Sequence, residues 1–508
     1  MHFVNHTKRA VNVKALAASL AAAIALIGPG LVATTSAAPN AGSRLDPTLK
    51  THPLLQVGAQ KEPDKKVRVI VQTERRDDDL HAIARSVDAE VDEQFSFVQA
   101  MVLEVPQKRA LELARNPHVR YVSLDGPVRH QGSNFDASHL LTSYPGTISV
   151  PNGVWNGGIP STGKGVAVAV LDSGVNAQHP DFYASNVKSV NVNKTALNTE
   201  DGHGHGTHVV GIINGRSSDG HYIGIAPDAT VYSIKISDDS GSAHEADMLR
   251  GLQWVYDNRG STNIKAVNLS VASATAESYL TSVVDAAVEQ LWLNGITVVV
   301  AAGNRGAAVD AEWYAPANDP FVITVGALDD NLTTAPGDDS LATFSGRGMT
   351  QDGYNKPDVV APGRKIYAPL ASSSATLATL LPTHISADGR HIRLSGTSMA
   401  APVVTGVVAL VKQVFPNMTP DQMKWLFVNN LHPYNAQPDK AGMVNPQQML
   451  TSAKSTSTWG TANKGVMPNV GINTSNGTVQ WGTSYWDTSY WDTSYWDTSY
   501  WDVMSNYD

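Results

Sequence analysis

Short runs made mostly of apolar residues recur along the chain after Gly163, and segments with helical patterns separate them. The runs are Val166–Leu171, Val231–Ile236, Ile264–Leu269, Ile296–Ala301 and Phe321–Val325. Strands that are apolar along their whole length are typical of parallel sheets covered by helices on both faces. The sequence therefore predicts a doubly wound, mostly parallel α/β sheet, which we expect within residues 133–455.

Capping signals mark the helices expected in this region. The first expected helix is opened by the capping box Ser242–Glu245 and continues to about Asn258. A second covers Ser278–Asn294 and is closed by Gly295, and two more cover Met399–Phe415 and Pro420–Asn430. Thr419 is the expected cap of the last helix and Pro420 its first residue, because proline is favoured there.

Residues 66–130 show a different pattern, in which short alternating runs enclose two helical stretches. We expect strands over Val67–Gln72, Glu90–Val98, Met101–Val105 and Val119–Leu124, and helices over Asp79–Val87 and Gln107–Asn116. The resulting β-α-β-β-α-β order is the split βαβ arrangement, which predicts a small ferredoxin-like α+β domain. Its sequence contains no catalytic constellation.

The first 38 residues are organised like a secretory signal peptide. Three basic residues precede the apolar run Ala15–Ile27, and the small residues Thr34–Ala38 provide a cleavage site. Gly28 interrupts the run before it reaches the roughly 20 residues that a bilayer span needs. We expect residues 1–38 to direct secretion and to be removed, residues 39–65 to be a linker, and no later segment to span a membrane.

Composition narrows the classes of function. Of the 508 residues, 42% are hydrophobic and 16% are charged, which suits a globular protein with more than one structural unit. The net charge of −9 provides no basic footprint for nucleic acid. Because the chain has no cysteine, disulfides, zinc ribbons and thiol catalysis are excluded, and any nucleophile is an oxygen or an amine.

Four polar residues follow apolar runs or open a helix, where a doubly wound sheet binds its ligands. They are Asp172, His205, Asn304 and Ser398. Each alone is an ordinary turn or cap residue, and His203, His205 and His208 together are also a candidate metal cluster. Jointly, the four supply an acyl-transfer site in which Ser398 is the nucleophile and His205 its general base. Asp172 would fix the imidazole tautomer, and Asn304 would donate to the oxyanion.

Two other classes of function stay open at this point. Gly396–Ala400 nearly matches the nucleophile elbow of an α/β-hydrolase esterase or lipase, which needs an acid and then a histidine after the serine. Asp421 and His432 are available, but this assignment leaves Asp172 and His205 without a role. The other alternative is an adhesive protein on an inactive scaffold, which only the carboxyl-terminal repeats favour.

The segments around the four residues resemble those of the subtilisin-like serine proteases. The specific motifs are Gly204–Val209 and Ser395–Pro402, and the resemblance covers about Ile159–Ala453. It implies a secreted serine endopeptidase that cleaves protein substrates through an acyl-enzyme and requires no cofactor. The family's triad falls on Asp172, His205 and Ser398, its oxyanion amide on Asn304, and its substrate-binding backbone on Ser270, Val271 and Ala272.

The resemblance also gives the amino-terminal domain a role. Residues 66–130 resemble the family's inhibitory propeptide, an intramolecular partner that occupies the cleft until autocleavage, expected between about Gly126 and Thr142. Arg305, beside Asn304, either faces solvent or favours an acidic substrate residue. Leu370–Arg393 is an apparent insertion, either a surface flap or a tolerated loop.

A structural calcium ion is a further expectation from the resemblance. Asp181, in His179-Pro180-Asp181, matches a calcium ligand of the family, whereas the paired loop Arg216–Gly220 lacks the usual asparagine. Asp181 and Asp219 are the oxygen ligands that the chain still offers.

Beyond Ala453 the sequence becomes rich in Ser, Thr, Asn and Gly and then repeats. Residues 456–482 are an expected linker, Thr-Ser-Tyr-Trp-Asp occurs four times over 483–502, and residues 503–508 complete the chain. A period of five cannot keep Tyr and Trp on one face of a strand. We expect either a plain tail or a segment whose aromatic rings contact cell wall or another surface.

Overall fold

The computed structural model describes residues 50–75, 78–130, 143–434, 441–456, 458–469, 471–473 and 478–480. The chain divides into two units, Met1–Leu45 and Asp46–Asp508, and all described residues belong to the second. The predicted signal peptide and the pentapeptide repeats lie outside the described residues, so both stay predictions.

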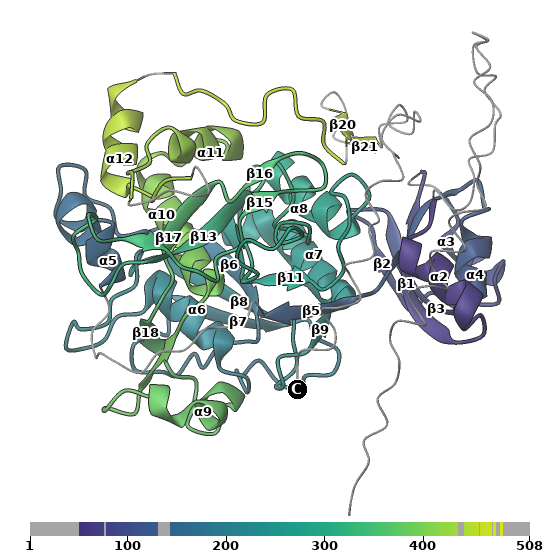
Figure 1. Cartoon of the computed structure of the whole chain (residues 1–508), viewed down its shortest axis with the longest axis horizontal. Helices are drawn as coiled ribbons and strands as arrows, with labels where there is room; N and C mark the ends of the chain where they lie inside the picture. The colour runs from purple at the N-terminus through teal and green to yellow at the C-terminus, as the bar shows by residue number, and fades with distance from the viewer. Residues whose placement is uncertain are drawn as a thin grey trace, which may run out of the picture. The chain divides into compact units, whose positions relative to one another are not determined.

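An eight-stranded sheet forms the centre of the larger domain (Figure 1). Its spatial order is β14-β13-β12-β10-β6-β8-β7, with β17 also paired to β13. The strands are β6 (Ala167–Asp172), β7 (Val187–Asn191), β8 (Thr230–Lys235), β10 (Ile264–Leu269), β12 (Thr297–Ala301), β13 (Ile323–Asp329), β14 (Ser340–Leu341) and β17 (Val359–Pro362). Every pair is parallel except β13–β14, which confirms the predicted mostly parallel sheet.

Helices cover both faces of this sheet. They are α6 (His205–Asn214), α7 (Glu245–Thr262), α8 (Val283–Leu293), α10 (Thr397–Val414), α11 (Pro420–Val428) and α12 (Pro446–Ser455). α6 and α10 pack against each other and against the strands, as do α7 and α8 (Figure 1). The doubly wound α/β architecture is thereby confirmed.

Two predicted helix starts are wrong. The cap of α7 is His244, whose capping box is completed by Asp247, because the preceding Ser242 lies in a turn closed by Asp238. α8 begins at Val283, after Ser282 accepts a hydrogen bond from the backbone of Asp285. The predicted start of α11 is confirmed, since Thr419 and Gln422 form its capping box.

One helix requires a correction to the expectation about membrane segments. Among the residues that the structure describes, α10 is long and apolar enough to cross a bilayer. Its most apolar window is 89% buried inside the protein, however, which identifies α10 as a core helix. All residues from Thr397 to Lys412 are buried.

The amino-terminal domain has the predicted β-α-β-β-α-β order. It contains β1 (Lys66–Thr73), α3 (Leu80–Arg85), β2 (Glu93–Phe95), β3 (Ala100–Pro106), α4 (Gln107–Leu113) and β4 (Val119–Leu124), with the sheet order β2-β3-β1-β4. The predicted linker 39–65 is wrong over Pro53–Lys61, which forms helix α2. α2 packs on α4 and β4 because its Leu55 is fully buried in the core of this domain.

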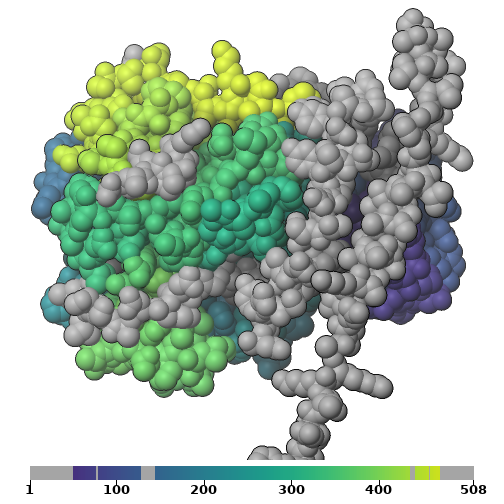
Figure 2. All heavy atoms as spheres, in the orientation of Figure 1, coloured from purple at the N-terminus to yellow at the C-terminus, as the bar shows by residue number. Residues whose placement is uncertain are grey.

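Several short elements border the main sheet. β5 (Pro127–His130), β9 (Ala243–His244) and β11 (Val271–Ser273) form a separate three-stranded sheet. The apparent insertion contains α9 (Thr376–Leu380) and η3 (Pro382–His384), and its end, β19 (His391–Leu394), pairs with β18 (Ile366–Pro369). In Figures 1 and 2 the segment around α9 is the green lobe at the lower edge.

The remaining short elements are α5 (Tyr144–Thr147), η2 (Pro151–Trp155), β15 (Gly348–Met349), β16 (Asn355–Lys356), β20 (Gly471–Asn473) and β21 (Thr478–Gln480). The main sheet reverses its strand order between β6 and β10. The chain builds β7 and β8 on one side of β6 and then β10, β12 and β13 on the other. Such a switch point is where doubly wound sheets place their sites, at the carboxyl ends of the strands.

Candidate active site

Asp172 and His205 form a buried acid–base pair at this switch point. Asp172 is the last residue of β6, and His205 is the first residue of α6. Their Oδ1 and Nδ1 atoms lie 2.8 Å apart, and both residues are almost completely buried. Burial alone would lower the pKa of His205, but the charge and hydrogen bond of Asp172, with the charge of Asp201, raise the pKa above its ordinary value.

The glycines beside His205 allow this pairing. Gly204, the cap of α6, has φ of 99°, which favours glycine. A Cβ atom on Gly206 would lie 2.2 Å from the carbonyl oxygen of Gly174 and 3.2 Å from the Asp172 carboxylate. The helix that carries His205 can therefore approach the end of β6 only because Gly206 has no side chain.

Ser398 lies beside the end of β10, the strand next to β6 in the sheet. It is the second residue of α10, and its Oγ lies 3.3 Å from the carbonyl oxygen of Ser270. Ser270 Oγ in turn donates to the carbonyl oxygen of Ser398, at 2.9 Å. Since Leu269 pairs with Leu171, Ser270 and Asp172 follow at the same edge of the sheet. The structure therefore brings Ser398 to the strand ends where the Asp172–His205 pair lies.

Asn304 follows β12 and is fixed against the start of α10. Its Oδ1 accepts hydrogen bonds from the backbone N–H of Thr397, at 2.9 Å, and from Thr397 Oγ1, at 3.2 Å. Gly303 N–H also donates to Thr397 Oγ1. Because both donors engage the amide oxygen, the NH₂ end of Asn304 is directed away from Thr397.

The segment predicted to bind substrate backbone is an edge strand paired with another part of the chain. Ser270 precedes β11, whose Val271 and Ala272 are buried. β11 pairs antiparallel with β5, with Val271 opposite His130 and Ala272 opposite Arg129. An extended segment of the chain therefore lies along the strand that begins beside Ser398.

The histidines near the site do not form the metal cluster that the sequence also offered as an alternative. His208 Nε2 lies 3.1 Å from the carbonyl oxygens of both Ile366 and Ile392, and burial lowers the pKa of His208 to about 3. Within the described ranges no group of three or more His, Asp or Glu side chains could hold a metal ion. The metal-cluster interpretation of the histidines is therefore wrong.

The partners required for a nucleophile elbow lie elsewhere. Asp421 Oδ1 accepts hydrogen bonds from Trp292 Nε1 and Asn463 Nδ2, at 2.9 and 3.0 Å. His432 Nδ1 lies 2.7 Å from the carbonyl oxygen of Pro433. These contacts give neither residue the acid–histidine pairing that an α/β-hydrolase requires.

Arg305 pairs with its own neighbours. Its guanidinium forms an ion pair with Asp310 and lies over the ring of Tyr314, 4.9 Å from the centroid. An acidic substrate residue would compete with Asp310 for this cation. The expected preference for acidic residues stays a prediction.

The residues around Asp181 do not fit the expected calcium site. Asp181 is buried, and its Oδ2 lies 2.7 Å from His391 Nε2. His391 Nδ1 lies 3.0 Å from Asp388, and its ring stacks on Tyr222 with centroids 3.7 Å apart. Asp181 and Asp388 therefore each hold one ring nitrogen of His391, so the Asp181 oxygen that a calcium ion would need already has a partner. Asp219 is bonded instead to Ser217 and to the backbone N–H of His221.

We predict that His391, and not calcium, stabilises this part of the fold. Adding a chelator should leave the midpoint of thermal unfolding unchanged. His391→Phe should lower the free energy of unfolding by about 3–5 kcal/mol, because the buried carboxylate of Asp181 would lose its partner. Circular dichroism with and without millimolar calcium measures both. Asp219→Asn is the matched control, with little expected change. Rescue of His391→Phe by calcium, or chelator sensitivity that Asp181→Asn removes, would contradict the prediction.

Sequence reasoning missed the residues that connect these groups. Asp201 accepts hydrogen bonds from the backbone on either side of His205 and from Ser173, and His391 fixes the insertion to Asp181. An aspartate shortly before a glycine-rich helix start was the available signal for Asp201. No local signal marks His391, because its partner is 210 residues away.

Comparisons with known proteins identify the family of this chain. The chain matches the Subtilase family (Peptidase_S8) over residues 163–477, more than half of its length. Serine protease AprX of Bacillus subtilis (strain 168) is 36% identical over 300 residues, covering 57% of this chain and 67% of that protein. Extracellular serine proteinase of Thermus sp. (strain Rt41A) is 30% identical over 356 residues, covering 70% and 75%.

A solved structure supports the fold. Fervidolysin from Fervidobacterium pennivorans, a keratinolytic enzyme related to subtilisin, superposes with a TM-score of 0.60 at 24% identity, covering 76% of this chain and 61% of that one. At this identity the likeness concerns the fold alone. The family match and the relatives above lead to one conclusion: the chain belongs to the subtilase family and is a subtilisin-type serine endopeptidase.

Proposed function

We propose that Ser398, His205 and Asp172 are the catalytic triad of this peptidase and that Asn304 completes its oxyanion hole. The observation that carries the proposal is the buried 2.8 Å hydrogen bond between Asp172 and His205, at the same sheet edge as Ser398. This bond occupies Nδ1 of the imidazole. Nε2 is therefore the nitrogen that can take the proton of a serine.

The reaction follows from these positions. Ser398 Oγ attacks the carbonyl carbon of a peptide bond while His205 Nε2 takes its proton. Negative charge develops on the carbonyl oxygen, where the Asn304 NH₂ and the Ser398 N–H, at the amino terminus of α10, stabilise it. His205 then protonates the leaving amine, and water hydrolyses the acyl-enzyme by the same steps in reverse.

We further propose that residues 66–130 are an inhibitory propeptide. β5 lies along β11 as an added strand, the way an extended substrate would bind. Asp125 Oδ1 accepts the backbone N–H of Ala246 in the first turn of α7, at 2.9 Å, and Gln72 Nε2 donates to the carbonyl oxygen of Thr281, at 3.2 Å. Residues 131–142, which contain most of the expected cleavage region, lie outside the described residues.

The propeptide is expected to bind more weakly as pH rises. Burial raises the pKa of Glu277 to about 8, and Tyr121 of β4 hydrogen-bonds this carboxyl. Burial also raises the pKa of Glu245. The ordinary pKa of a glutamate is near 4.5. The protonated acids therefore stabilise the complex of propeptide and peptidase domain fully below about pH 4.5. This stabilisation is lost as pH rises through 8.

The rate of activation of the full-length chain measures this effect. After autocleavage, activity per titrated active site should appear at least about tenfold faster at pH 8 than at pH 5. Glu277→Gln keeps the group neutral, so this variant should release its propeptide more slowly than wild type at pH 8. Equal release rates of the two proteins at pH 8 would refute the role of Glu277.

Secretion belongs to the same proposal. The support is the signal-like pattern of residues 1–38 and the name of the Thermus relative, an extracellular serine proteinase. The proposed substrates are proteins and peptides outside the cytoplasm. Surface binding by the TSYWD repeats stays a prediction, which retention of the full chain, but not a chain ending at Thr478, on bacterial envelope material would support.

A substrate comparison tests the function. The purified full-length chain should hydrolyse a peptide amide and lose its own amino-terminal domain, with little lipase activity on triglyceride emulsions. A Ser398→Ala chain should remain intact under the same conditions. Lipase activity in excess of amidase activity would favour the α/β-hydrolase alternative, and absence of both activities would favour the inactive scaffold.

A further inference from the structure

We propose that Asp201 is a positioning residue for the acid–base pair. It connects the turn that carries His205 to the strand end that carries Asp172. The inference rests on the proposed roles of these two residues. It goes beyond the triad, because it holds that the buried carboxylate of Asp201 fixes the position of His205 relative to Asp172.

The carboxylate of Asp201 binds the start of α6 with both oxygens. Oδ1 accepts the backbone N–H of Gly204 and Oδ2 accepts that of Thr207, each at 2.7 Å. Asp201 is 4% exposed. Carboxylates satisfy the unpaired N–H groups of a first helical turn and are favoured by the helix dipole. The backbone on either side of His205 is thereby held by one side chain.

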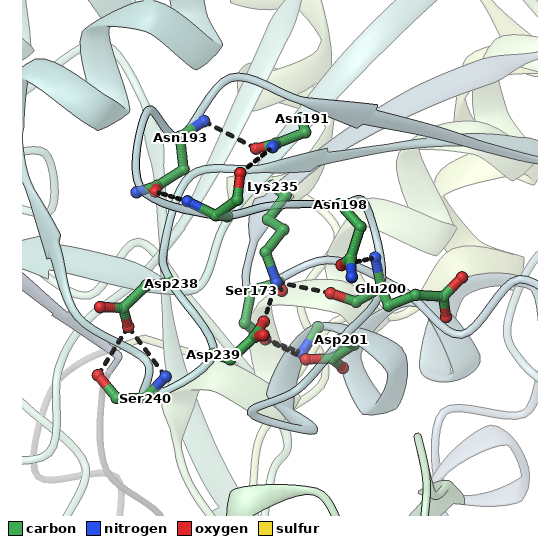
Figure 3. Close-up of polar contacts among 12 residues, drawn as sticks. Ser173, Asn191, Asn193, Asn198, Glu200, Asp201, Lys235, Asp238, Asp239 and Ser240 are labelled. Atoms are coloured by element: carbon green, nitrogen blue, oxygen red, sulfur yellow. Dashed lines mark hydrogen bonds and ion pairs between the residues drawn. The ribbon is translucent and has the colours of Figure 1, made fainter.

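Ser173 extends this contact to the acid. Its hydroxyl donates to Asp201 Oδ1 at 2.7 Å and accepts the N–H of Gly206 at 2.9 Å. Its backbone N–H donates to Asp172 Oδ1 at 2.8 Å. Asp172 Oδ1 is also the atom that binds His205. Asp201 and Ser173 therefore join both partners of the pair in one hydrogen-bonded cluster, part of which Figure 3 shows.

Lys235, the last residue of β8, contacts the same cluster from the neighbouring strand. It lies opposite Asp172 in the β6–β8 pairing, and its side chain is fully buried. Its Nζ donates to the carbonyl oxygens of Ser173 and Glu200, at 2.9 and 2.6 Å, and to Asp239 at 2.6 Å (Figure 3). The residue after Asp172 and the residue before Asp201 are thus bound to the same ammonium group.

The charge of Asp201 affects the pKa of His205, so the role of Asp201 can be tested through the pH dependence of the reaction. Asp172 and Asp201 raise the pKa of His205, whereas burial lowers the pKa values of His203 and His208, which stay neutral. His205 must be neutral to act as a base, so kcat/KM rises as pH passes its pKa. Removing the charge of Asp201 lowers that pKa and shifts the acidic limb to lower pH.

Asp201→Asn tests the inference in the full-length chain. The amide cannot accept at both ends, so at least one N–H of the His205 turn loses its partner. We expect kcat per titrated active site to fall about tenfold to a hundredfold, with KM nearly unchanged and the acidic limb shifted by up to about one pH unit. A variant that only loses stability would have fewer active sites, each with wild-type kcat and an unchanged pH profile.

Two further variants complete the test. Glu200→Gln is the matched control, because this neighbouring carboxylate carries the same charge but its side chain is exposed and points away from Asp201 (Figure 3); near wild-type kinetics are expected. Ser173→Ala breaks the connection but keeps the charge of Asp201, so kcat should fall without a shift of the acidic limb. It also serves if Asp201→Asn does not accumulate.

The outcomes separate this inference from the proposed function. Wild-type kcat and pH profile in Asp201→Asn, or wild-type kcat in Ser173→Ala, would overturn the positioning role while leaving the triad intact. Full activity of His205→Ala would instead overturn the triad itself. A fall in kcat for both cluster variants, with His205→Ala inactive, supports both.

Discussion

Replacing Ser398 by alanine is expected to lower kcat/KM for a peptide amide by at least about 10⁴-fold while peptide binding is retained. The substitution removes a single heavy atom, Oγ. In the proposed mechanism this oxygen forms the ester bond of the acyl-enzyme. The helix amino terminus and the Asn304 amide stay in place, so the carbonyl group can still bind. A fluorogenic peptide measures turnover, and competition with a product-like peptide measures binding.

A neighbouring serine provides the control for this experiment. Ser395 belongs to the same motif and is buried, but its Oγ accepts the backbone N–H of Lys365. Ser395→Ala should therefore leave kcat close to that of wild type. The assignment fails if Ser398→Ala keeps more than about one per cent of wild-type turnover after contaminating protease has been removed.

Asn304→Leu should give the second largest loss. The substitution keeps the approximate volume but removes the NH₂ donor, and the loss known for an oxyanion-hole donor in subtilisin is about 10²–10³ in kcat, or roughly 3–4 kcal/mol. KM should change little, because the donor acts mainly on charge that develops in the transition state. Steady-state kinetics with peptide amides distinguish the two parameters.

The contact between Asn304 and Thr397 provides a graded comparison. Thr397→Val removes the hydroxyl that donates to Asn304 Oδ1 but keeps the backbone N–H bond to the same atom. A smaller fall in kcat is expected, since the amide is still oriented by one of its two contacts. If Asn304→Leu raises KM without lowering kcat, Asn304 binds the substrate rather than the transition state.

The fold was largely predictable because burial dictates the residue pattern. β6, β8, β10, β12 and β13 are buried along most of their length, since helices cover both faces, and apolar residues predominate in them. β7 was missed because it is an edge strand with mostly half-exposed residues. α2 was missed because a short amphipathic helix leaves little periodic signal in a polar segment.

The proposed site was predictable residue by residue, but its connections were not. Four polar residues at strand ends and a helix start were sufficient to propose an acyl-transfer centre. The bonds of Asp201 to Ser173 and of His391 to Asp181 join segments far apart in the sequence. Such pairs depend on which turns the tertiary packing brings together, and neither composition nor periodicity encodes that choice.

Covalent labelling tests the central claim most directly. A fluorophosphonate that reacts with an activated serine is incubated with the full-length chain, and the modified residue is identified by peptide mass spectrometry. The account predicts modification of Ser398 alone, with a rate that rises as His205 loses its proton and is abolished in His205→Ala. Labelling of a different serine, or labelling of Ser398 at an unchanged rate in His205→Ala, would contradict it.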